Sequence, residues 1–193
     1  MNSVERVISL SSGCFVNVVW PVIKSSLGSG RVYPVEGNTL NDMQMTLDRV
    51  SGIDAWHVME NDEGVRGIAS RIQPDDGRPR WPYNSFTIRK SIVSGSDTEY
   101  HKRMRAITRP DRGYLFPPVT VQAYVKTYDG PVVSVAIMNT ADLYQSVNAH
   151  EWPVVPGADG NKFLAVWWGS IKRMGYKIKI IEVGQNERHT QYR

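Results

Sequence analysis

A reversal of charge along the chain marks the residues whose types and spacing could support chemistry. Residues 36–63 carry seven acidic side chains and one basic one, whereas residues 64–112 carry eleven basic and five acidic side chains. The acidic residues of the first segment are Glu36, Asp42, Asp48, Asp54, Glu60, Asp62 and Glu63. Carboxylates can hold a divalent cation, and cations beside them can bind the oxygens of a phosphodiester. An ordinary solvated surface can show the same pattern.

The basic segment is a candidate nucleic-acid interface. The cations that could follow a phosphate backbone are Arg78, Arg80, Arg89, Lys90, Lys102, Arg103, Arg105 and Arg109. Trp81, Tyr83 and Tyr100 lie among them and could stack on bases. Because the whole chain has a net charge of only +4, the prediction of a polyanion partner rests on this clustering. An ordinary charged helix face is the alternative.

Hydrophobic spacing predicts the elements that position these side chains. The periodicity predicts a helix over Thr39–Val50, and alternation predicts a hairpin of the strands Ile53–Met59 and Val65–Gln73. Tyr83–Lys90 is expected to be the next strand. Ser96-Asp97-Thr98-Glu99 is a capping box, which predicts a helix running to about Ile107. The core face of that helix would carry Tyr100, Met104 and Ile107, with Lys102, Arg105 and Arg109 on an outward face and Arg103 beside it.

The other segments complete the expected fold. The predicted elements are strands at Val119–Lys126 and Val132–Met138, a short helix from Thr140, an amphipathic helix over Lys162–Met174 and a last strand over Tyr176–Val183. Phe15–Ile23 is expected to be a short helix or a strand, broken at Pro21. This order predicts an α/β fold in which a mixed central β-sheet is flanked by helices. We expect one domain over 1–193, with a core at 38–139, an N-terminal extension at 1–37 and a helix–strand addition at 140–193.

The element order and Gly52-Ile53-Asp54 resemble the PD-(D/E)XK, or restriction-endonuclease-like, nuclease superfamily over roughly residues 38–139. The resemblance implies an α-β-β-β-α-β core in which Asp54 binds a divalent metal such as Mg²⁺. It also implies that the next strand supplies Glu or Gln, one spacer and Lys. This chain departs from that pattern, because Arg71-Ile72-Gln73 stands there instead.

The departure leaves several residues to share the roles that the resemblance implies. The candidate catalytic residues are Asp54, Gln73, Arg71, Glu99 and Lys102, and the candidate metal ligands are Asp54, Asp48 and Glu99. Gln73 would ligate the metal or position water, while Arg71, Lys102 and Arg103 would hold phosphate. Each has a plainer interpretation: Asp54 can bond a backbone N–H, Arg71 can pair with Asp54 across the hairpin, and the capping box alone explains Glu99.

Cysteine content and hydropathy bear on the compartment. A lone cysteine, Cys14, excludes an intramolecular disulfide and fits a reducing cytosol. The apolar segment Cys14–Trp20 is too short to cross a bilayer, and it lacks the basic lead and cleavage site of a signal peptide. We therefore expect a cytoplasmic protein with no membrane partner.

These observations leave three functional hypotheses. The first is a divalent-metal-dependent DNA endonuclease of the phage, mobile-element or defence type common among compact members of the resembled family. The second is a catalytically inactive module that binds nucleic acid or protein through the same basic face. The third is a structural or assembly protein, because the adjacent Trp167 and Trp168 could make subunit contacts in a homo-oligomer or with a protein partner.

Overall fold

The computed structural model describes residues 3–35, 51–60, 64–75, 84–157 and 160–183 of the chain. Its main feature is a six-stranded sheet with the order β1-β2-β3-β5-β6-β9. The strands are β1 (Gly30–Pro34), β2 (Ala55–Met59), β3 (Val65–Pro74), β5 (Val119–Val125), β6 (Val132–Asn139) and β9 (Ile178–Glu182). β3 and β5 are parallel and every other neighbouring pair is antiparallel, so the sheet is mixed. The expected α/β class and the β2–β3 hairpin are confirmed.

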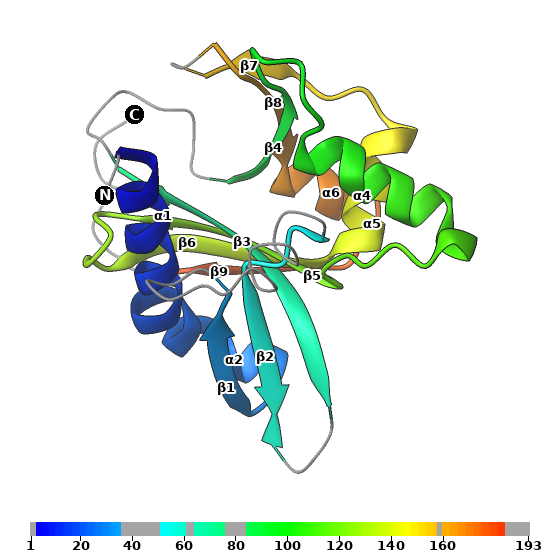
Figure 1. Cartoon of the computed structure of the whole chain (residues 1–193). Coiled ribbons are helices and arrows are strands. Elements are labelled where there is room, and N and C mark those ends of the chain that lie inside the picture. Colours follow the sequence, from blue (N-terminus) through cyan, green and yellow to red (C-terminus); the bar gives the residue numbers. More distant parts are fainter. Residues whose placement is uncertain (1–2, 36–50, 61–63, 76–83, 158–159, 184–193) are drawn as a thin grey trace.

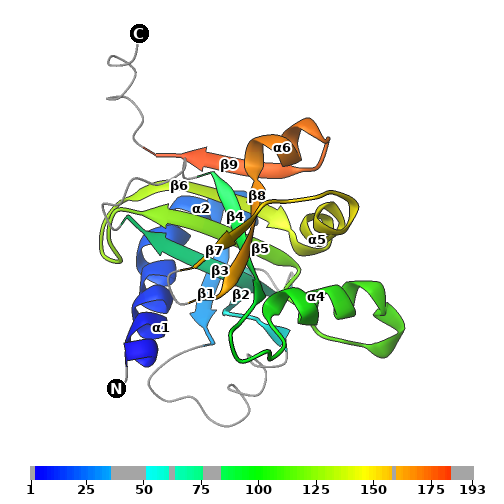
Figure 2. The ribbon, with the colours of Figure 1, turned by 90° about the horizontal axis from the view of Figure 1, so that it is seen from above.

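A second sheet of three strands lies across the first one, with the order β4-β8-β7. It consists of β4 (Ser85–Ser91), β7 (Val154–Pro156) and β8 (Lys162–Trp167), and Figure 2 shows it in front of the central strands. β4 was expected as a strand, but it leaves the central sheet and pairs antiparallel with β8. Together with α4 (Glu99–Thr108), β4 forms the connection that a parallel β3–β5 pair requires.

The prediction of one helix over Lys162–Met174 is wrong in its first half. Lys162–Trp167 is strand β8, and only α6 (Trp168–Arg173) is helical. Leu164, Ala165 and Val166 are consecutive buried residues, as a strand covered on both faces requires, so periodicity alone could not separate strand from helix here. Gly175 ends the segment with a φ of 85°, a left-handed conformation that favours glycine after a helix.

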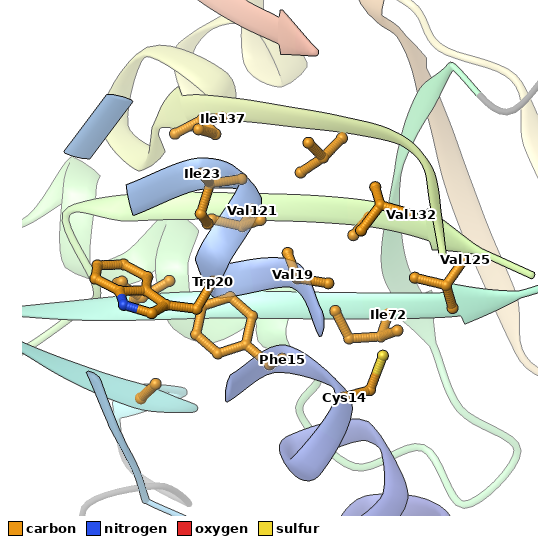
Figure 3. Packing of buried hydrophobic residues seen from close by; sticks show 14 of the residues in the cluster. Cys14, Phe15, Val19, Trp20, Ile23, Ile72, Val121, Val125, Val132 and Ile137 are labelled. Atoms are coloured by element: carbon orange, nitrogen blue, oxygen red, sulfur yellow. The ribbon is translucent and has the colours of Figure 1, made fainter. Parts of the chain in front are cut away.

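An N-terminal helical segment covers one face of the central sheet. It runs through α1 (Ser3–Cys14), a π-helical stretch (Phe15–Val19) and α2 (Trp20–Leu27). Pro21 was expected to break it, but the helix continues, because Pro21 occupies the first turn of α2 and the Trp20 N–H bonds the Phe15 carbonyl in the π pattern. Figure 3 shows Phe15, Val19 and Ile23 packed on the sheet.

The opposite face of the sheet carries α4, α5 (Thr140–Ala149) and the second sheet, as Figure 1 shows. Alternation along β6 separates the two cores, since Val135 and Ile137 pack under the N-terminal helix while Ala136 and Met138 face the other side. Trp168 is buried in this second core, whereas Trp167 keeps part of its surface exposed. A contact of these two tryptophans with a partner stays a prediction. Trp167 is the one of the pair whose side chain is partly exposed and could make it.

The N-terminal helix also bears on the expected compartment. By length and composition alone, Arg6–Leu27 could cross a membrane. Cys14, Phe15, Val19 and Ile23 of this helix pack in the chain's own core. Burial raises the pKa of the Cys14 thiol to about 11, so Cys14 is a structural cysteine with little thiolate at neutral pH. The cytoplasmic location and the absence of a membrane partner stay predictions.

Candidate functional site

Residues from five elements line one pocket between the central sheet, β4 and α4. Asp54 enters it from the segment before β2, Arg71 from β3, and Glu99 and Arg103 from α4, while Gln122 comes from β5. The volume of about 20 Å³ admits a water molecule or a single ion but not a nucleotide. Asp54, Arg71 and Glu99, far apart in the sequence, therefore line the same pocket, and their catalytic and metal-binding roles stay predictions.

Backbone hydrogen bonds hold Asp54 at the mouth of the hairpin. Its N–H donates to the Ile68 carbonyl and its carbonyl accepts from the Val35 N–H, both at 2.9 Å. Its carboxylate oxygen Oδ2 accepts the Ser70 N–H. Asp54 therefore accepts a bond from a backbone N–H, as its plainer interpretation predicted. A carboxylate has about four acceptor positions, and the Ser70 N–H occupies one of them.

Arg103 is buried, which contradicts the expected position beside the outward face of the helix. Only 5% of the residue is exposed. Its Nη2 donates to the Gly52 carbonyl at 3.2 Å and lies 3.6 Å from the Glu99 carboxylate, and its Nη1 donates to the Tyr144 hydroxyl at 3.4 Å. These partners offset the cost of burying the charge, which sequence periodicity does not reveal. Arg103 thereby ties α4 to the turn that presents Asp54.

Glu99 faces the pocket and takes no part in the cap of α4. The N-cap is Thr98, whose reciprocal partner is His101, so the expected capping box at Ser96–Glu99 is wrong by two residues. Burial alone would raise the pKa of the Glu99 carboxyl. The attraction of Arg103, followed by Arg71, Arg89 and Lys102, outweighs burial and lowers this pKa below its usual 4.5. Glu99 is therefore ionised at neutral pH and surrounded by cations.

The lowered pKa of Glu99 predicts a pH dependence of stability. A carboxyl whose folded pKa is depressed stabilises the fold above its unfolded pKa, and that stabilisation is lost as the pH falls through the folded pKa. We expect the wild-type chain to be more stable than Glu99→Gln above pH 4.5 and the difference to shrink below it. Urea unfolding at several pH values measures this. A difference that is independent of pH would contradict the assigned ionisation.

Arg71 and Arg89 share an aromatic support on β8. The guanidinium carbons lie 4.8 Å and 5.8 Å from the centroid of the Phe163 ring. Such stacking fixes the plane of a guanidinium, whose N–H groups are the donors that bind phosphate. Both charges act on Glu99. The predicted phosphate-binding role of Arg71 is thus compatible with its position in the pocket.

Gln122 is a pocket residue that the sequence reasoning missed. It is 1% exposed, and its Oε1 accepts hydrogen bonds from the Thr87 N–H and hydroxyl, both at 3.2 Å. Its Nε2 is buried without a hydrogen-bond partner in the structure. Since buried amides are normally satisfied, this donor suits a bound water or ligand oxygen. The sequence feature that could have indicated Gln122 is its amide side chain within the mostly apolar strand β5.

The other predicted site residues are less closely involved. Gln73 lies further along β3 and does not line the pocket; its Oε1 is buried without a partner. Lys102 is outside the lining, although its charge acts on Glu99. Arg105 forms an ion pair with Asp97, which favours the ordinary surface interpretation for that residue, and Lys90 and Arg109 are exposed. Asp48, Arg78 and Arg80 lie outside the described residues.

The pocket offers carboxylates that Mg²⁺ could use as ligands. Among the described residues, no three His, Cys, Asp or Glu side chains cluster closely enough to hold a metal ion. Mg²⁺ is commonly bound by one or two protein carboxylates, with waters and substrate phosphates completing its shell. Asp54 and Glu99 fit that requirement by type, and the pocket has room for one ion. Arg103 is the competing partner of Glu99.

Comparison of the chain with protein-family models, with curated proteins and with solved structures finds no match. The resemblance to the PD-(D/E)XK superfamily therefore rests on the element order and on Gly52-Ile53-Asp54 alone.

Proposed function

We propose that this chain acts on nucleic acid as a divalent-metal-dependent DNA endonuclease whose pocket engages the backbone phosphate. One observation carries the proposal: Asp54 and Glu99, from a strand start and a distant helix, line the same pocket as Arg71 and Arg103. Two carboxylates with neighbouring guanidinium groups are the set that metal-assisted phosphodiester hydrolysis uses. The pocket is too small for a nucleotide, so the phosphate would lie at its opening.

Each side chain has a distinct task in this proposal. Asp54 and Glu99 would hold the Mg²⁺, which when bound supplies an activated water and offsets the negative charge that develops on the phosphate. Arg71, stacked on Phe163, would bind the non-bridging oxygens. Arg103, buried among its partners, is a positioning residue that keeps Glu99 near Asp54. Gln122 Nε2 would donate to a water or oxygen in the pocket.

A specific observation favours a second candidate, a nucleic-acid-binding module without catalysis. Four cations, Arg103, Arg71, Arg89 and Lys102, act on the single carboxylate of Glu99 and compete with a metal for it. No acidic residue precedes Arg71 with the spacing of the family motif. In such a module the pocket would bind phosphate through its guanidinium groups alone, and Asp54 would serve as a structural acceptor for Ser70.

Cleavage of supercoiled plasmid and of single-stranded DNA separates the two candidates. We expect cleavage in Mg²⁺ or Mn²⁺, none in EDTA, and a loss of about 10²-fold or more in Asp54→Asn. Asp129→Asn is the matched control, because it removes an exposed carboxylate in the turn between β5 and β6. Binding that weakens steeply with salt in both variants, with no cleavage by any of the proteins, would instead establish the binding module.

A further inference from the structure

A groove outside the pocket lies at one end of the central sheet, beside the end of α2. Its volume is about 790 Å³, within the range of small-molecule sites. Leu27 of α2, Val119 of β5 and Ile137 of β6 give it an apolar floor. Lys179 lies directly opposite Ile137 in the β6–β9 register, on the sheet face that the N-terminal helix covers elsewhere. The groove thus lies at the end of the sheet, lined by residues from both faces and separate from the pocket at Glu99.

The rim of the groove is strongly basic. Arg66, Lys172, Lys177 and Lys179 line it, whereas Asp142 is the one carboxylate among the residues that the structure places around it. The three lysines are exposed and form no ion pair that the described residues show. Edge lysines often only keep a sheet from aggregating, so their exposure alone would not indicate a ligand.

Arg66 gives the independent indication of a ligand. Its Nε donates to His57 Nδ1 at 3.1 Å, and His57 is fully buried and uncharged in this contact because desolvation, followed by the charge of Arg66, lowers its pKa. The Nη2 of Arg66 is buried without a hydrogen-bond partner. A half-buried guanidinium with an unsatisfied donor carries a free-energy cost that an anion in the groove would relieve.

We propose that this groove binds the phosphate groups of a nucleotide, either free or as part of a strand, with the base over the apolar floor. Arginine and lysines together suit phosphate, since the guanidinium offers paired donors and the ammonium groups add charge. The groove is lined by four cationic side chains and one carboxylate, so its net positive charge suits the several negative charges of a nucleotide. This site goes beyond the proposed cleavage and does not depend on Asp54 or Glu99.

Binding measurements in EDTA test the groove with two probes, thymidine triphosphate by calorimetry and fluorescein-labelled hexathymidylate by anisotropy. We expect Lys177→Ala/Lys179→Ala to weaken binding by about tenfold or more. Both lysines are exposed, so the double variant should fold. Arg31→Ala, exposed on the opposite sheet edge, should leave the triphosphate affinity unchanged. Arg71→Ala is measured alongside it, because that change alters the pocket instead of the groove.

The outcomes distinguish the source of the phosphate and the failure of each proposal. Equal affinity for both probes supports a free nucleotide. A strand is supported if the oligonucleotide binds more tightly and if the slope of its log affinity against log salt concentration falls by about two in the double variant. The groove proposal is overturned by binding that only Arg71→Ala weakens, or by no binding of either probe at about 1 mM. It is also overturned if pentaglutamate binds as tightly as the nucleotide probes and if Lys177→Ala/Lys179→Ala weakens its binding by the same factor. None of these results depends on whether the chain cleaves DNA.

Discussion

Replacing Trp168 with alanine is expected to lower the free energy of unfolding by about 4 kcal/mol. Trp168 is 1% exposed, and its ring lies 6.1 Å from the Phe86 ring and 5.8 Å from the Tyr124 ring, measured between centroids. It therefore joins β4 of the second sheet to β5 of the central sheet at the start of α6. Truncation would leave a large cavity where the two layers meet, and the surrounding backbone can only partly collapse into it.

Urea unfolding followed by circular dichroism measures this effect. Trp167→Ala is the matched control, because the neighbouring tryptophan is only partly buried and should cost clearly less. Equal losses in the two variants would contradict the strand–helix junction at Trp167 and Trp168.

Replacing Arg103 with methionine is expected to lower the free energy of unfolding by about 3 kcal/mol, near the lower end of the range for breaking a buried ion pair. The change leaves the Gly52 carbonyl and the Tyr144 hydroxyl without their donor. Glu99 remains partly solvated and keeps other cations nearby, which limits the loss. The chain would also lose the tie between α4 and the turn before Asp54, so cleavage should fall with stability.

Thermal and urea unfolding of Arg103→Met measure the loss, with Lys102→Met as the control at the adjacent, half-exposed position. The lysine change removes the same charge from the same helix at a half-exposed position, whereas Arg103 is buried. If the two variants were equally stable, Arg103 would have to lie on the surface, where the helical periodicity first placed it.

Local patterns predicted most of the strands correctly. Strands were predicted at the positions of β2, β3, β5, β6 and β9, and alternation predicted the β2–β3 hairpin. Two errors arose where neighbouring segments decide the outcome. β8 is a strand because it pairs with β4, and Pro21 continues a helix because a π-helical stretch precedes it. Neither contact is visible in the local residue pattern.

The candidate site was predicted in part. Asp54, Arg71 and Glu99 line one pocket, as the shared roles proposed for them require, but the parallel pairing of β3 with β5 was not predicted. Gln73 was expected from the family pattern but lies beyond the pocket. The burial of Arg103 and the role of Gln122 depend on partners at long sequence separation, Gly52 and Thr87, so sequence spacing could not predict them.

The most direct measurement of the proposed site is the rate of plasmid cleavage by the wild-type chain, Asp54→Asn, Glu99→Gln and the double variant. Two carboxylates that hold one metal act as a unit, so their effects on the rate are not additive. We expect each single change to slow metal-dependent cleavage by about 10²-fold or more and the double variant to be no slower than the slower single variant. Multiplied losses in the double variant, cleavage that survives both changes, or a wild-type chain that does not cleave would contradict a shared site at Asp54 and Glu99.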